Sequence, residues 1–226
     1  MRHAFPLILL GVALSFLGAQ SGVLGAFLIW LGCDFLLLGG ARFRRAHGLF
    51  GKRPDGTLPV WSWFIFLPLF SLGILIWHLV RIVSAEPPFN HVSSQLVVGR
   101  RLLSRERAGE FANYIDLTAE FQEPRAFREA PGYVAFPVLD GSAPSPECLH
   151  AVVARLRPGA TFIHCAQGHG RTGLFALAVL LTSGAVRTVD EGLVLLANAR
   201  PAIRLSREQA ECIRSYSMAY ALRSQD

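Results

Sequence analysis

The sequence has few cysteines, and this shortage excludes two classes of protein. Cys33, Cys148, Cys165 and Cys212 are the only cysteines in 226 residues, too few and too scattered for a disulfide framework. Histidines and cysteines form no cluster with metal-ligand spacing, so we expect neither a metal nor another cofactor. Cys148 and Cys212 fall on apolar helix faces, where we expect them to be buried packing residues.

Excess basic charge is missing from most of the chain. Residues 1–84 carry seven Lys/Arg against two Asp/Glu, whereas residues 85–226 carry fifteen against fourteen. A nucleic-acid-binding domain needs a basic stripe on its folded surface, so we expect no nucleic-acid partner. The basic residues at 42–45 and 52–53 instead suit the surface of an anionic membrane.

Three long apolar runs fill the first third of the chain, at Ala4–Ala19, Gly22–Ala41 and Trp61–Val83. A helix that crosses a bilayer needs about 20 apolar residues, with a range of about 17 to 25. The second and third runs meet this length and the first is marginal. We therefore expect an all-α transmembrane anchor of two to three helices over residues 1–84, with the lipid bilayer as a partner.

Two other interpretations of this region are disfavoured. A buried core of a soluble protein does not explain three clustered runs with basic flanks. A secretory signal would need a better cleavage site than Leu17–Ala19, and a second apolar run follows almost at once. Glycines recur every seven residues and predict a seam of close helix contact: Gly11, Gly18, Gly25, Gly32 and Gly39. Asp34, an acid inside the second run, is either functional or packed within the helix bundle.

Residues 164–173 concentrate groups that handle phosphate. They read His-Cys-Ala-Gln-Gly-His-Gly-Arg-Thr-Gly, with Cys165 and Arg171 six positions apart. The apolar residues before this segment predict a strand and those after it a helix. A loop between a strand end and a helix start gathers backbone N–H groups and the positive end of the helix dipole, which bind an anion and favour a thiolate. We predict that Cys165 is a nucleophile and that Arg171 binds two phosphate oxygens.

The rest of this segment has supporting roles. Thr172 can donate a hydrogen bond to the thiolate, and His164, at the strand end, should be buried and orient the loop. Gly168 and Gly170 let the backbone curl closely around a ligand. The predicted phosphate-binding loop comprises Ala166, Gln167, Gly168, His169, Gly170 and Arg171.

A departing oxyanion needs a proton, and Asp140 is the candidate general acid. It follows an apolar strand and opens a Gly/Pro loop. The structural alternative is an Asp that caps the helix beginning near Ser145. Gln209 is a possible water-positioning residue, although a solvated helix position is the simpler interpretation. Asp116 is interpreted as a strand-end or turn residue.

Together these residues resemble the signature of the cysteine-based protein tyrosine phosphatase superfamily, which is His-Cys, five residues, then Arg-Ser/Thr-Gly. The position of Asp140 is similar to that of the general acid in the dual-specificity branch. The resemblance covers Val92 to Leu222 and implies an α/β sheet flanked by helices. It also implies a cysteine-dependent phosphoric monoester hydrolase that works through a phosphocysteine. Two other classes with similar loops are disfavoured. Rhodanese loops are a residue shorter, and low-molecular-weight phosphatases carry the loop near their N-terminus.

These residues are compatible with several substrate classes. The resemblance implies phosphotyrosine, phosphoserine or phosphothreonine proteins. A phospholipid headgroup such as phosphatidylglycerophosphate is an alternative, and a non-catalytic phosphate-binding module is another. Relatives that act on polyphosphorylated inositides carry lysines in the loop, whereas this loop has Ala166, Gln167 and His169.

We predict three regions: an anchor at 1–84, a stiff linker at 85–91 and a phosphatase domain at 92–226, with helices on both faces of its sheet. The predicted strands are Leu96–Val98, Tyr114–Leu117, Tyr133–Pro137 and Ala160–His164, and the predicted helices are 105–112, 147–156, 174–183, 189–199 and 207–220.

The sequence gives conflicting indications of the side of the membrane on which the phosphatase domain lies. Positive-inside counting puts the basic loop at 42–53 in the cytoplasm, and three spans would then put the domain on the opposite side. Either one run does not cross, Ala4–Ala19 being the weakest, or Arg81, Arg100 and Arg101 decide the orientation, or the domain faces outward. We favour a cytoplasmic domain on an integral membrane protein, because a thiolate nucleophile survives best in reducing surroundings.

Overall fold

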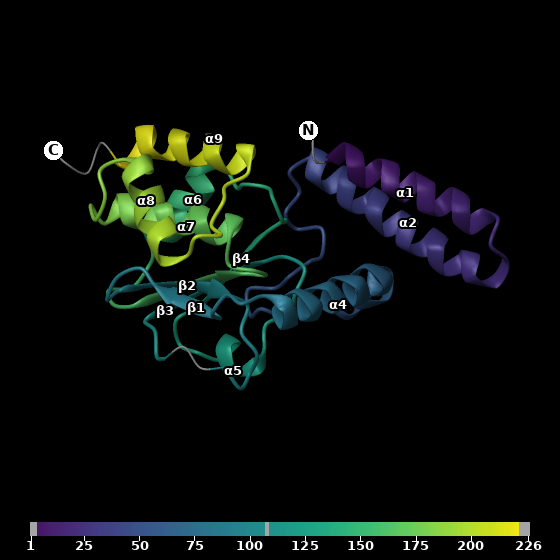
Figure 1. Ribbon diagram of the computed structural model, residues 1–226, viewed down its shortest axis with the longest axis horizontal. Helices are drawn as coiled ribbons and strands as arrows, with labels where there is room; N and C mark the ends of the chain where they lie inside the picture. The colour runs from purple at the N-terminus through teal and green to yellow at the C-terminus, as the bar shows by residue number, and fades with distance from the viewer. Residues whose placement is uncertain (1–3, 107–108, 222–226) are drawn as a thin grey trace. The chain divides into compact units, whose positions relative to one another are not determined.

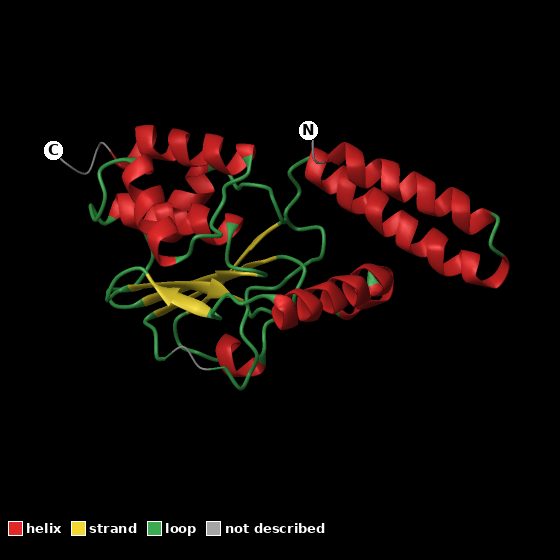
Figure 2. Cartoon of the chain, in the orientation of Figure 1, coloured by secondary structure: helices red, strands yellow, loops and turns green. Residues whose placement is uncertain are grey.

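The structure is a computed structural model that describes residues 4–106 and 109–221 (Figure 1). The chain divides into two compact units. The apolar unit comprises Met1–Arg53, Thr57–Ala85 and Ala119–Gln122. The α/β unit comprises Pro54–Gly56, Glu86–Thr118 and Glu123–Asp226. Regular structure in the described part of the first unit is helical, and the second unit holds the sheet (Figure 2).

Helices α1 (Ala4–Ala19) and α2 (Gly22–Phe43) form a hairpin whose turn uses Gly22 at a φ of 56°. The predicted glycine seam is confirmed. A Cβ added at Gly11 would lie 2.7 Å from the Gly32 carbonyl oxygen, and one added at Gly25 would overlap the backbone of Gly18. The two helix backbones approach so closely that the seam has no room for a methyl group.

Alanine substitutions at two glycines of α2 should have opposite effects. Gly25→Ala should lower the free energy of unfolding by about 1–3 kcal/mol, the usual cost of overpacking. Gly40→Ala is the matched control, because an added Cβ there meets nothing within 4 Å. It should stabilise the helix by up to about 1 kcal/mol, because alanine has the higher helix propensity. Denaturant unfolding of the full chain in detergent measures both, and equal effects would contradict the seam.

The third apolar run is not one continuous helix. It forms α3 (Val60–Ile65) and α4 (Leu67–Val83), separated by Phe66, which has non-helical dihedrals. Pro68 explains the break, since proline lacks an N–H donor and its ring clashes with the preceding turn. The predicted single helix over Trp61–Val83 is therefore wrong.

Asp34 holds the start of α4. Its buried carboxylate accepts a hydrogen bond from the Leu69 amide at 3.3 Å, in the first turn of that helix. A carboxylate at a helix N-terminus satisfies an orphan N–H group and complements the helix dipole. Nearby, Trp30 Nε1 donates to the Ile65 carbonyl oxygen at 2.6 Å. Asp34 thus has a packing role within the apolar unit.

The number of expected membrane spans is also corrected. Within the described residues, α2 is the one helix long and apolar enough to cross a membrane, judged by length and composition. α1 and α4 are shorter apolar helices. The expectation of two to three spans is reduced to one candidate.

The α/β unit is built on a five-stranded sheet in the order β1-β2-β5-β3-β4. The strands are β1 (Phe89–His91), β2 (Leu96–Arg100), β3 (Asn113–Thr118), β4 (Tyr133–Val138) and β5 (Thr161–Cys165). β1 is antiparallel to β2, and the other pairs are parallel. Because β5 is central, all five of its residues are buried, and its C-terminal end carries Cys165.

Alternate residues of the strands face different layers. Val98, Ile115 and Ile163 pack in the main core, whereas Val97 and Phe162 pack in a smaller cluster with Phe127 of helix α5 (Arg125–Arg128). The helices are α5, α6 (Pro146–Val153), α7 (Gly170–Thr182), α8 (Val189–Ala199) and α9 (Arg207–Tyr216), the last continuing as a π-helical turn, Ser217–Ala221. Helices α6 to α9 cover the first face, and α5 lies by the other (Figures 1 and 2).

All four predicted strands form, with ends shifted by two residues or fewer. The segment predicted as a linker, 85–91, contains β1. The predicted helix at 105–112 is wrong for its described residues, which are turn or irregular, while 107–108 lie outside the described residues. Of the two cysteines expected to be buried, Cys212 is buried and Cys148 is exposed.

Candidate active site

Cys165 lies at the end of β5, where the chain enters the predicted phosphate-binding loop. Its side chain is buried, and the Gly168 amide donates to Sγ at 3.3 Å. Gly168 has a φ of 77°, and a Cβ there would overlap the Gly99 backbone, so this position requires glycine. The loop therefore folds back far enough to aim a backbone donor at the sulfur.

Arg171 and Asp140 meet although they come from different parts of the chain. Arg171 is buried in the first turn of α7, and its Nη1 donates to the Val138 carbonyl oxygen at 2.9 Å. Its Nη2 lies 3.2 Å from Asp140 Oδ1, while the Asp140 side chain is 82% exposed. Ser145 caps α6 by accepting from the Cys148 amide, so the alternative role of Asp140 as that cap is wrong.

The start of α9 holds the loop that carries Asp140. Ser206 Oγ donates to the Gly141 carbonyl oxygen at 2.8 Å, and Gln209 Nε2 donates to the Ser142 carbonyl oxygen at 3.1 Å. Gln209 also accepts from the Ser206 amide at 2.9 Å, completing a capping box. Interpreting Gln209 as a solvated residue was wrong, since it is buried and both ends of its amide are engaged.

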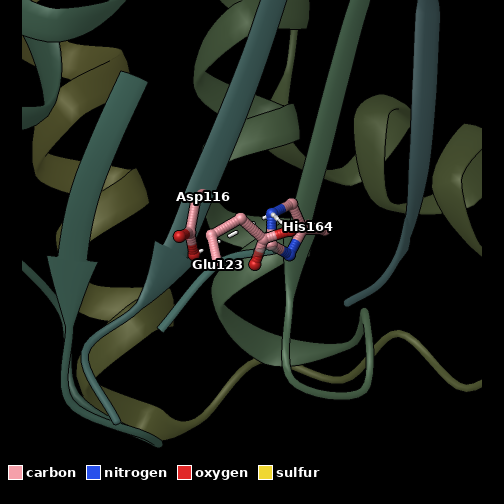
Figure 3. Close-up of side chains that lie close together, drawn as sticks. All are labelled: Asp116, Glu123 and His164. Carbon is pink, nitrogen blue, oxygen red and sulfur yellow. Dashed lines mark ion pairs between the residues drawn. The ribbon is translucent and has the colours of Figure 1, made fainter. Parts of the chain in front are cut away.

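His164 is buried on the opposite face of the sheet from Cys165, because consecutive strand residues point to opposite faces. Its Nε2 lies 3.8 Å from Asp116 Oδ1 and 3.8 Å from Glu123 Oε1 (Figure 3). Asp116 is a buried residue of β3, and neither it nor Glu123 was expected beside the loop. The hydroxyl of Thr172 is buried and has no hydrogen-bond partner among the described residues, so the hydrogen bond predicted from Thr172 to the Cys165 sulfur is absent from this structure.

The ligand atoms of His164, Asp116 and Glu123 lie within 4.8 Å of one another, close enough for a metal site. Their surroundings fit a cation poorly. Asp116 accepts from the Tyr133 hydroxyl at 2.7 Å, and Glu123 lies 3.3 Å from the Arg101 guanidinium. Donors and a positive charge already occupy carboxylate oxygens that a metal would need.

Two tyrosines complete this buried network. The Tyr133 hydroxyl donates to Asp116 Oδ2, and the Tyr114 hydroxyl donates to Glu123 Oε1 at 3.2 Å. Burial, followed by the two carboxylates, raises the pKa of both phenols above the ordinary value. The tyrosines therefore remain protonated donors, and we describe the cluster as a hydrogen-bonded ion network beneath the loop.

The α/β unit has the fold of dual-specificity and protein tyrosine phosphatases, and the comparison with solved structures establishes this similarity at the level of fold. Tk-PTP in its active form matches with a TM-score of 0.52 at 23% identity, over 59% of this chain and 98% of that one. Human DUSP28 matches with a TM-score of 0.51 at 19% identity, over 60% and 96%. PTPMT1 in complex with PI(5)P matches with a TM-score of 0.51 at 14% identity, over 61% and 99%. No family model and no curated protein matches the chain.

Proposed function

We propose that the chain is a membrane-anchored phosphomonoester hydrolase that works through a phosphocysteine intermediate. The observation that carries this proposal is that Asp140, from a separate segment, meets Arg171 beside the loop that begins at Cys165 at the end of a central strand. A nucleophile, an oxyanion binder and a proton donor are the groups that this reaction needs.

The reaction has two displacements. Cys165 Sγ attacks phosphorus, an S–P bond forms, and the bond to the leaving oxygen breaks as Asp140 gives that oxygen its proton. The Asp140 carboxylate then takes a proton from water, whose oxygen attacks phosphorus and breaks the S–P bond. Arg171 and the loop amides stabilise the charge on the equatorial oxygens in both steps. A bound phosphate competes with Asp140 for the Arg171 guanidinium.

The substrate class we propose is a singly phosphorylated protein. Among the variable loop positions, His169 is the one basic side chain, and its Nε2 lies 2.7 Å from Glu86 Oε2. A second phosphate would have to displace this carboxylate, so polyphosphorylated ligands are disfavoured. A phospholipid headgroup is the second candidate. It is favoured by the apolar unit, which carries all the exposed large hydrophobic side chains of the described chain except Val194 and Met218.

Membranes from cells that express the chain provide the test. Phosphatase activity should stay in the membrane pellet after an alkaline carbonate wash. Asp140→Asn should lower kcat for an alkyl phosphate by about 10²-fold, the usual contribution of a general acid. The loss should be smaller for p-nitrophenyl phosphate, because p-nitrophenolate leaves without being protonated. An equal loss for both substrates would contradict a general-acid role.

Two other outcomes would redirect the proposal. Phosphate binding without turnover of either substrate would identify a binding module. Activity released by the wash would contradict the anchor. To separate protein from lipid substrates, Asp140→Ala protein can be incubated with membrane lipids and with cell extract, and the retained ligand identified.

A further inference from the structure

The buried side chain of Arg200 pins the outer side of the phosphate-binding loop. Arg200 follows α8, and its Nη2 donates to the Gln167 carbonyl oxygen at 3.0 Å, while Nε donates to the Gly168 carbonyl oxygen at 3.0 Å. In a trans peptide the carbonyl and the following N–H point in opposite directions. Holding the Gln167 carbonyl outward therefore turns the Gly168 N–H inward, where it donates to Cys165 Sγ.

The other donors of Arg200 bind residues 86–90, at the start of the segment Glu86–Thr118 of the α/β unit. Its Nη1 donates to the Pro87 carbonyl oxygen at 3.0 Å and to Asn90 Oδ1 at 2.8 Å, and its Nη2 also donates to Glu86 Oε2 at 3.1 Å. All five N–H groups of the guanidinium thus have acceptors. Burial lowers the pKa of Arg200, and the Glu86 charge opposes this effect.

Glu86 also contacts the loop directly. Its Oε2 lies 2.7 Å from His169 Nε2, so one carboxylate oxygen joins the loop histidine and the Arg200 guanidinium. The side chains of Glu86 and His169 are both about one third exposed, at 30% and 32%. Glu86 follows the last residue of α4, Val83, by three positions in sequence.

We propose that Glu86 is a positioning residue for the phosphate-binding loop. It orients His169 directly, and through Arg200 it keeps the carbonyls of Gln167 and Gly168 turned away from the bound anion. The loop amides are then already turned toward the anion site before the anion binds. No binding free energy is lost in reorienting them. This inference rests on the proposed function, because it assigns a loop conformation to the same site.

Phosphate protection of Cys165 tests this inference without requiring turnover. The full chain is alkylated with iodoacetamide at increasing inorganic phosphate, and the half-protecting concentration is measured. Glu86→Ala should raise that concentration about tenfold, and Glu86→Gln about threefold, as expected for losing charge-assisted hydrogen bonds. In a double-mutant cycle, Glu86→Ala and His169→Ala should be non-additive, because the two side chains share one contact.

Glu129→Gln is the matched control, because Glu129 forms an exposed ion pair with Arg125 at 2.6 Å. It should leave phosphate protection unchanged. If Glu86→Ala does not fold, Glu86→Gln carries the test, since glutamine keeps the size and one acceptor oxygen. Wild-type protection in both Glu86 variants would overturn the inference. A wild-type chain that binds phosphate without turnover would refute the proposed function while leaving the Glu86 test valid.

Discussion

Replacing Cys165 with serine should reduce hydrolysis of a small aryl phosphate to background, a loss of about 10⁴-fold or more. The substitution changes one atom, and the serine hydroxyl is far less acidic than a thiol, so an attacking anion is not formed. The loop amides and Arg171 remain, and inorganic phosphate should still bind. Steady-state assays and phosphate titration of the same purified protein measure the two quantities separately.

Cys148→Ser is the control for this experiment, because Cys148 is a free, exposed cysteine at the start of α6. It should keep wild-type activity. Wild-type turnover in purified Cys165→Ser protein would refute the phosphocysteine mechanism. Trapping phosphate on the wild-type chain by rapid acid quench should label Cys165, and label elsewhere would refute it as well.

The core of the site could be predicted because it is local in sequence. The loop that joins β5 to α7 is contiguous, so the spacing of Cys165 and Arg171 determines its geometry. The strands were predicted for a similar reason, since each is a short apolar run bounded by turn residues. Asp140 was predicted to be the general acid because a leaving oxyanion requires a proton donor. It lies beside Arg171, and its catalytic role stays a prediction.

The supporting residues could not be predicted because their contacts join distant parts of the chain. Arg200 and Glu86 are 114 positions apart, and Gln209 reaches Ser142 over 67 positions. No local sequence pattern predicts contacts between residues so far apart in the chain. In the apolar unit the third run was predicted from its apolar length alone, and that length says nothing about Pro68, which divides the run into two helices.

Arg171→Lys should lower kcat/KM by about 10³-fold, although the positive charge is kept. The guanidinium places two parallel N–H donors on two phosphate oxygens. A lysine ammonium is a point charge on a shorter side chain and cannot make this paired contact. In this site the difference is increased by burial, because Arg171 is 3% exposed and a misplaced donor has no water to replace it. The inhibition constant for inorganic phosphate should rise by a smaller factor than kcat/KM falls. The paired donors of the guanidinium contribute most in the transition state, when charge moves onto the equatorial oxygens.

Arg125→Lys supplies the matched control for this prediction, since the Arg125 side chain is 79% exposed and forms an ion pair with Glu129. Its kinetic constants should equal those of the wild-type chain. Thermal unfolding separates chemistry from folding, because Arg171 also donates to the Val138 carbonyl oxygen at the end of β4. A lysine variant that melts at the wild-type temperature but has lost turnover places the defect in the transition state. Equal losses in phosphate affinity and kcat/KM would instead assign Arg171 to ground-state binding alone, and the proposed role in phosphoryl transfer would be abandoned.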